Sequence, residues 1–158
     1  MVKKAICLLL CAGLLFSAAA AEQEVLLPGG RYAVDLPDWM DYSDAVDGES
    51  GVEAYVSKDL EMDYLSYRKE DAVQLGMAET LKETAKMRKE SGADVELRKV
   101  NGIEMLCYRT EDEEDGTPCI GYLFEDGELV IEIAFWYATQ EAADETKKIM
   151  ESIREKDA

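Results

Sequence analysis

The residues best suited to chemistry lie in the segment CYRTEDEEDGTPC, residues 107–119. Two thiols flank a run of five carboxylates, so the segment is a candidate metal loop, redox pair or disulfide-linked hairpin. Glu111, Glu113 and Asp115 have the alternate spacing that opens an EF-hand calcium loop. Tyr122, however, occupies the position of that loop's bidentate glutamate, and a proline interrupts the pattern. We therefore expect a solvated acidic turn, with these three carboxylates as weak calcium candidates.

The two cysteines, Cys107 and Cys119, are predicted to form a disulfide bond. If the chain between them folds as a β-hairpin that turns around Glu113, they stand directly opposite each other on neighbouring strands. Such residues have Cα atoms about 4.5–5.5 Å apart, which a disulfide accepts. Two buried thiols are the alternative, since cysteine often packs as a small apolar residue. A redox centre is disfavoured because the sequence has no close Cys-x-x-Cys pair beside a helix start.

Histidine is absent from the sequence, which limits the reactions that the chain can catalyse. Its absence excludes Ser-His and Cys-His nucleophile pairs and removes the commonest zinc ligand. A glycine-rich phosphate loop after a predicted strand is also missing. We therefore assign no catalytic residue and no cofactor. With 35 acidic residues, a carboxylate-based hydrolase remains an alternative function.

The first 21 residues have the features of a secretory signal peptide. Lys3 and Lys4 precede the apolar stretch 6–16, and small residues follow up to an expected cleavage near Ala21. A transmembrane anchor would need about 20 apolar residues without this alanine-rich end. We expect a secreted protein, either extracellular or in the cell envelope.

A lipid anchor is disfavoured, because neither Cys7 nor Cys11 follows a small residue. After cleavage, residues 22–30 are expected to form a short lead-in and residues 31–156 a single domain.

The net charge is −18 for the whole chain and near −20 after residues 1–21 are removed. Nucleic acid and anionic membrane surfaces both require a basic protein surface, so neither is an expected partner. The acidic surface could attract a divalent cation weakly, or a basic partner. The partner is therefore expected to be a protein or a small ligand.

Hydrophobic patterning predicts the elements that position these residues. Strands are expected at residues 31–37, 51–57 and 63–69, with a loop over 38–51. A helix is expected from Glu70 to Ser91, ended by Gly92, and a last helix is expected after the N-cap Thr139. The apolar positions that support these helices are Val73, Met77, Leu81 and Thr84 in the first, and Ala142, Thr146, Ile149 and Ile153 in the last.

Four strands between the helices form a predicted meander with type I′ turns at Asn101-Gly102 and Asp126-Gly127. The first turn pairs Val100 with Ile103, and the second pairs Phe124 with Leu129. With the middle hairpin turning around Glu113, one core face is expected to hold Val95, Leu97, Leu106, Tyr108, Ile120, Tyr122, Phe124, Leu129, Ile131, Ile133 and Phe135. The opposite, mixed face would hold Met105, Cys107, Cys119, Gly121, Leu123, Val130, Glu132, Ala134 and Trp136.

The predicted fold class is α+β. An antiparallel sheet of about six to seven strands, ending in the meander, packs with two main helices in the order two or three strands, helix, four strands, helix. Aromatic residues near the sheet give a candidate ligand surface of Trp39, Tyr42 and Trp136, with Glu132 on the mixed face. Glu132 interrupts an apolar strand, and we expect it to be a partly exposed, paired carboxylate.

Five segments carry a family resemblance: GRYAVDLPDWM, VEAYVSKD, VELRKVNGIEMLCYR, FEDGELVIEIAFWY and the closing helix AADETKKIMESIRE. In these segments the sequence resembles the PsbP-like superfamily. It spans nearly the whole chain after the signal segment. The resemblance implies an α+β domain that acts as a binding or assembly factor rather than an enzyme. The expected function is a secreted, non-enzymatic binding module, with a carboxylate-based hydrolase or a calcium-responsive structural protein as alternatives.

Overall fold

The computed structural model describes residues 21–43, 53–76 and 78–156. Residues 1–20 of the predicted signal segment lie outside the described residues, as do residues 44–51 of the predicted loop, residues 51–52 of the predicted strand 51–57 and Met77 of the predicted helix. Within the described ranges, none of the helices has the length and apolar character needed to cross a membrane.

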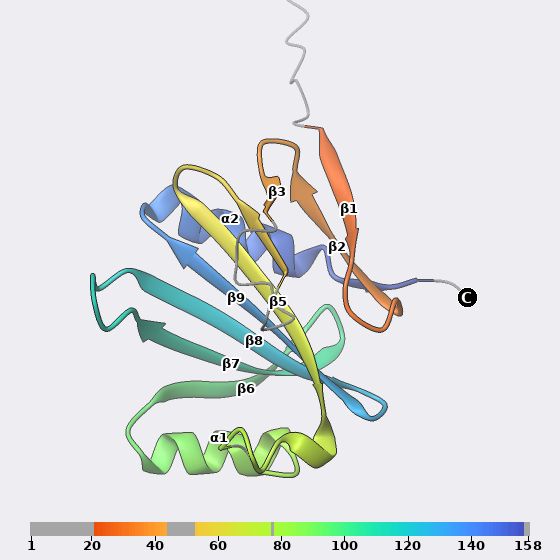
Figure 1. The fold of residues 1–158 in the computed structure, drawn as a ribbon, viewed down its shortest axis with the longest axis vertical. Coiled ribbons are helices and arrows are strands. Elements are labelled where there is room, and N and C mark those ends of the chain that lie inside the picture. Colours follow the sequence, from red (N-terminus) through yellow and green to blue (C-terminus); the bar gives the residue numbers. More distant parts are fainter. Residues whose placement is uncertain (1–20, 44–52, 77, 157–158) are drawn as a thin grey trace, which may run out of the picture.

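The described residues form two antiparallel sheets and two α-helices (Figure 1). Before the first helix come β1 (Glu22–Leu26), β2 (Tyr32–Pro37), β3 (Asp41–Ser43), β4 (Glu53–Val56), β5 (Leu60–Arg68) and a 3₁₀ turn (Lys69–Asp71). The remaining elements are α1 (Leu81–Glu90), β6 (Asp94–Val100), β7 (Ile103–Glu111), β8 (Pro118–Asp126), β9 (Leu129–Tyr137), α2 (Gln140–Glu151) and β10 (Arg154–Glu155).

The larger sheet has the strand order β3-β4-β5-β9-β8-β7-β6, and the smaller sheet has the order β1-β2-β10. The chain thus places β5 beside β9 in the centre, and β6 to β9 form a meander. This arrangement confirms the predicted α+β fold with an antiparallel sheet, a closing meander and two helices (Figure 1).

Two hydrophobic clusters lie on opposite faces of the larger sheet. One is shared with α2 and the smaller sheet and includes Tyr122, Phe124, Ile131, Ile133, Phe135, Met62, Val34, Leu36, Ile149 and Ile153. The other lies beneath α1 and includes Ala85, Val95, Leu106, Leu123 and Val130. Because both faces are covered in part, apolar residues occur at consecutive positions along the central strands.

The two outer hairpins of the meander test the predicted turns. Val100 pairs with Ile103 as predicted, and Asn101 and Gly102 both have positive φ, which a type I′ turn requires. In the second hairpin, however, Asp126 pairs with Leu129, so the predicted register is wrong by two residues. A shift of two keeps each side chain on its predicted face.

The larger error in the predicted register lies in the middle hairpin, formed by β7 and β8. Leu106 pairs with Leu123, and Cys107 pairs with Tyr122 rather than with Cys119. The register differs from the prediction by three residues, and an odd shift moves a whole strand's side chains to the other face. Val95, Leu97, Leu106 and Tyr108 therefore lie on the α1 face, and Met105 and Cys107 lie on the α2 face.

The reason for this shift is the length of the turn over residues 112–117. The Asp112 N–H donates to Thr117 O at 2.8 Å, and the Gly116 N–H donates to Asp112 O at 3.0 Å. The Asp112 side chain accepts the backbone N–H groups of Glu114 and Asp115 at 2.7 and 3.1 Å. These bonds close a six-residue loop centred between Glu114 and Asp115 rather than on residue 113.

The start of the domain also differs from the prediction. Part of the expected lead-in, residues 22–30, forms β1, which pairs with β2 along its whole length. Val25 on β1 is buried. Residues 22–26 therefore belong to the folded domain rather than to a lead-in before it.

The first helix is shorter than predicted. It begins at Leu81 because the Thr80 side chain caps it and accepts the Glu83 N–H. The preceding residues form the 3₁₀ turn and a further turn, in which Val73 is 62% exposed rather than buried. Gly92, with φ of +89°, follows the helix end as predicted.

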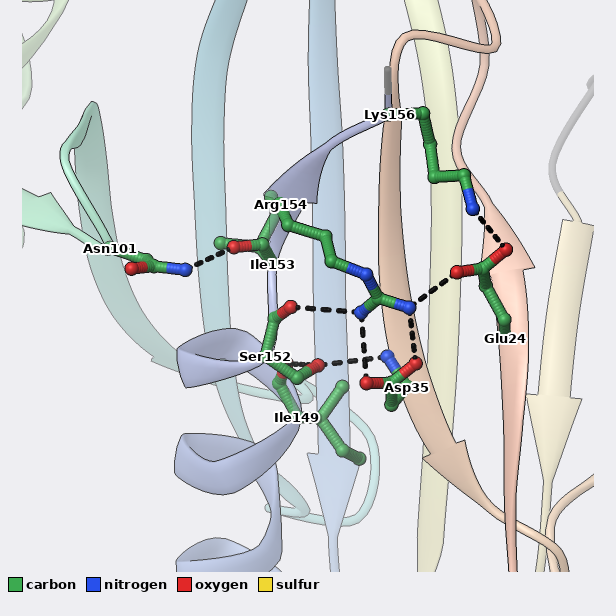
Figure 2. Close-up of polar contacts among 8 residues, drawn as sticks. All are labelled: Glu24, Asp35, Asn101, Ile149, Ser152, Ile153, Arg154 and Lys156. Carbon is green, nitrogen blue, oxygen red and sulfur yellow. Dashed lines mark hydrogen bonds and ion pairs between the residues drawn. The ribbon is translucent and has the colours of Figure 1, made fainter.

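The last helix agrees with the prediction, and the segment after it fastens the smaller sheet to the domain (Figure 2). Thr139 caps α2, and Ile153 is fully buried just beyond it. Arg154 then donates to both oxygens of Asp35 at 2.8 Å and to Glu24, so one guanidinium links β10 to β1 and β2.

Candidate functional site

A cleft of about 450 Å³ lies where the start of α2 meets two loops, one joining β2 to β3 and the other joining β4 to β5. Residues from all three segments line it: Trp39, Ser57, Lys58, Asp59, Leu60, Thr139, Glu141, Ala142 and Glu145. Concave sites of this size that combine aromatic and charged groups are typical of ligand binding.

Short hydrogen bonds fix the β4–β5 turn against the start of α2. The Ser57 N–H donates to Leu60 O at 2.8 Å, and the Leu60 N–H donates to Ser57 Oγ at 3.2 Å. The Ala138 N–H donates to Asp59 O at 3.0 Å, which joins the turn to the chain entering α2. The walls of the cleft are therefore held by backbone contacts and do not depend on a ligand.

Trp39 provides the aromatic wall of the cleft. Its side chain is 47% exposed, whereas the next residue, Met40, is 1% exposed. The Gln23 side chain donates to Met40 O at 2.6 Å, so the backbone that carries the tryptophan is tied to β1. A large aromatic side chain that stays half in water on a fixed backbone beside a cleft is typical of binding surfaces.

Three carboxylates give the cleft a negative balance. Asp59, Glu141 and Glu145 line it together with one cation, Lys58. Glu145 is paired with Lys148 at 2.7 Å, whereas within the described ranges no ion pair involves Asp59 or Glu141. Carboxylates beside an indole ring suit an ammonium or guanidinium group, which both the charge and the ring face attract.

The four residues predicted as a ligand surface do not come together. Trp39 lines the cleft, and Tyr42 forms an edge-to-face contact with Tyr55 at 5.5 Å on the β3–β4 edge. Trp136 and Glu132 lie on the opposite face of the larger sheet, on the side of α1. The acidic residues of the cleft were missed because Asp59 and Glu141 are far apart in sequence and carry no shared local pattern.

The α1 face holds a separate group of polar contacts. Tyr108 Oη donates to Glu132 Oε1 at 2.8 Å, and Trp136 Nε1 donates to Asp63 Oδ2 at 3.1 Å. Glu132 is half-buried and hydrogen-bonded, as expected for a paired carboxylate on this strand. Burial, together with the Glu132 carboxylate, raises the pKa of Tyr108.

Asp63 is a residue that sequence analysis missed. Burial and the neighbouring Glu61 carboxylate raise the pKa of Asp63 to about 6. Its Oδ1 atom is buried and has no hydrogen-bond partner within the described ranges. The sequence did offer one signal for Asp63: it is a carboxylate between two apolar residues of a central strand, Met62 and Tyr64, which are both buried.

A cavity of about 260 Å³ near this pair is lined by Glu61 and Trp136 together with Asp112, Asp115 and Thr117 of the acidic turn. Asp63 does not line it. The cavity therefore does not combine Glu61 with the Asp63 carboxyl group of raised pKa, as a two-carboxylate glycosidase site would require.

The weak calcium candidates lie on the acidic turn or beside it. Glu111, Glu113 and Asp115 are all exposed. The Asp115 carboxylate accepts hydrogen bonds from Thr117, which lower the pKa of Asp115. Across the described part of the chain, no group of three or more acidic or thiol side chains is arranged to hold a metal ion.

The predicted disulfide is not formed. Cys107 and Cys119 are free and buried, and the register places Cys107 on the α2 face and Cys119 on the α1 face. A bond between them would have to cross the sheet. The disulfide prediction was therefore wrong, because it depended on the wrong register of the middle hairpin. Burial and the nearby Asp63 carboxylate raise the pKa of Cys119 to about 12, and burial also raises that of Cys107.

Comparison with known proteins shows similarity in structure only. No family model matches the sequence, and no curated protein sequence matches it. A crystal structure from Bacteroides thetaiotaomicron VPI-5482 aligns with a TM-score of 0.58 and 15% identity, covering 85% of this chain and 48% of the other. This chain thus spans about half the length of that protein.

A second solved structure covers almost the full length of both proteins. It is the solution structure of cyanobacterial PsbP (CyanoP) from Synechocystis sp. PCC 6803, with a TM-score of 0.56 and 14% identity over 92% of this chain and 97% of the other. At this identity the likeness concerns the fold alone. It agrees with the element order and meander described above, and the chain therefore has a PsbP-like fold.

Proposed function

We propose that this protein is a non-enzymatic binding module whose α2 cleft receives a lysine or arginine side chain from a basic partner protein. The observation that carries the proposal is the meeting of Trp39 with Asp59 and Glu141 in one cleft of about 450 Å³. The chain's net charge of −18 favours the approach of such a partner. The proposal includes export of the protein, which the signal-like features of residues 1–21 support.

The binding energy in this proposal comes from three contacts. The aliphatic stem of a lysine packs on the Trp39 ring, and its ammonium group meets the carboxylates of Asp59 and Glu141. Because these carboxylates have no cation partner within the described ranges, a ligand does not have to displace an existing ion pair. The attraction between exposed charges should weaken as salt is added.

The test is a titration with short capped peptides that differ in one side chain. The peptides carry lysine, arginine or norleucine, which keeps the lysine stem without its charge. Binding is followed by the nuclear magnetic resonance signal of the Trp39 indole N–H. We expect saturable shifts with lysine and arginine, much weaker shifts with norleucine, and lower affinity at high salt.

Matched variants assign the binding to the cleft. Trp39→Ala and Glu141→Gln should each weaken binding by roughly fivefold or more. Asp144→Asn is the control, because it removes the same charge from an exposed residue of α2 that does not line the cleft. Equal loss in the Asp144 and Glu141 variants, or norleucine binding as tightly as lysine, would contradict the proposal.

A further inference from the structure

The positive charges of this acidic chain gather in one part of it. Residues 82–109 carry seven basic and five acidic side chains, a net charge of +2, whereas the rest carries ten basic and thirty acidic ones, a net charge of −20. The positive part comprises nearly all of α1 with β6 and most of β7. A small anion is therefore attracted to this region and repelled by the remainder of the chain.

A cavity of about 200 Å³ lies at this region's border, between the β6–β7 hairpin and the last turns of α2. Arg98, Lys99 and Lys147 line it, and Glu151 is the only carboxylate among its lining residues. Lys147 lies 3.8 Å from Glu151, which is long for an ion pair and leaves its ammonium group able to turn toward a ligand. The lining residues therefore carry a net charge of +2.

Arg98 is positioned by contacts within the protein. Its Nε donates to Cys107 Sγ at 3.1 Å, and its Nη2 donates to Tyr122 Oη at 3.2 Å. The guanidinium also lies over the Tyr122 ring, 5.6 Å from the ring centroid. Because the planar fork is already oriented, it loses little side-chain freedom when it binds a carboxylate.

One end of the Arg98 fork remains weakly engaged. Its Nη1 lies 3.5 Å from Glu96 Oε1, whereas a good charge-assisted hydrogen bond is about 2.7–2.9 Å long. A ligand carboxylate can therefore improve on the contact that this end makes in the free protein.

The cavity also has an apolar part. Val100 and Met150, which belong to the buried core, line it together with the Tyr122 ring. An inorganic oxyanion would leave this apolar surface in contact with water. A ligand with a short hydrocarbon tail would cover it and gain the associated free energy.

We propose that this cavity binds a small organic carboxylate. Its head group contacts Arg98 and Lys147, and its short apolar tail lies against Val100 and Met150. The site is independent of the α2 cleft, which lies on the β4–β5 side of the sheet, whereas this cavity lies at the β6–β7 side.

The test is a titration of the isotope-labelled protein with hexanoate at constant ionic strength. We expect saturable shifts of the backbone amides of Lys99, Asn101 and Met150. Sulfate, which has charge but no tail, serves as the matched ligand and should bind several times more weakly. Sulfate binding as tightly as hexanoate, or an absence of saturable shifts at these amides, would overturn the proposal.

Surface variants show whether the cavity or the general positive charge binds the ligand. Lys147→Gln changes an exposed side chain and should preserve the fold, and it should weaken hexanoate binding about fivefold. Lys86→Gln removes the same charge from the exposed face of α1, outside the cavity, and should change the affinity less than twofold. Equal weakening by the two substitutions would show diffuse attraction and would refute a built site.

Discussion

Gly121 is predicted to be intolerant of any side chain, because the ring of Tyr108 lies directly against it. The two residues are partners across β7 and β8. A Cβ atom on Gly121 would lie 1.8 Å from Tyr108 Cζ and 2.3 Å from its hydroxyl oxygen. Gly121 is not among the glycines with positive φ, so close approach rather than backbone conformation requires glycine here. Gly121→Ala should therefore displace the Tyr108 ring.

The size of the effect follows from what the ring loses. Moving it away from the α1 cluster forfeits about 2 kcal/mol of apolar burial. The 2.8 Å hydrogen bond from Tyr108 to Glu132 is also broken, at a cost of about 1–2 kcal/mol. Alanine recovers about 0.5–1 kcal/mol because it has less backbone freedom than glycine in the unfolded chain. The free energy of unfolding should fall by about 2–3.5 kcal/mol.

The assay is urea-induced unfolding of Gly121→Ala in two backgrounds, wild type and Tyr108→Ala. Without the ring, the added methyl group has space, so the cost of Gly121→Ala should vanish in the second background. The two substitutions should therefore couple by about 2 kcal/mol or more, as expected for residues in contact. An equal cost in both backgrounds, or a cost below about 0.5 kcal/mol in wild type, would refute this reasoning.

Three further predictions concern charge and thiols. The pKa of Asp63 is raised to about 6 in the folded protein, so its contribution to stability is present at low pH and is lost as pH rises from about 4 to above 6. Asp63→Asn should remove this dependence and stabilise the protein at pH 7 by about 1–2 kcal/mol, allowing for partial exposure. Equal pH profiles of the two proteins in urea unfolding would contradict this prediction. Arg154→Ala should lower the free energy of unfolding by about 1–2 kcal/mol, since it leaves carboxylates on β1 and β2 without their partner. The control Arg68→Ala removes a largely exposed ion pair and should change the free energy of unfolding by close to zero. Equal losses in urea unfolding would show that Arg154 does not stabilise the smaller sheet. Cys107 and Cys119 should resist alkylation in the native protein and should both react in denaturant without reductant, because both are free and buried. If mass measurement shows no modification under denaturing, non-reducing conditions, the two cysteines form a disulfide after all.

The sequence by itself determined the features that depend on neighbouring residues. Thr139 caps α2 because its side chain meets an N–H three residues away, and Asn101-Gly102 forms a tight turn because both residues tolerate positive φ. The α+β class also followed, since the order of strand and helix patterns is written along the chain. These interactions span only a few residues, so local sequence was enough to predict them.

The tertiary structure decided which faces and which distant residues meet. Both faces of the meander carry apolar residues, so the alternation of apolar and polar residues could not choose between registers. The Asp112 side chain stabilises a longer turn, and the resulting register places Cys107 and Cys119 on opposite faces. The candidate cleft likewise exists only because β5 pairs with β9, which brings Asp59 to the start of α2 beside Glu141. Contacts between residues so far apart are selected by the packing of the whole sheet, and no local pattern in the sequence encodes them.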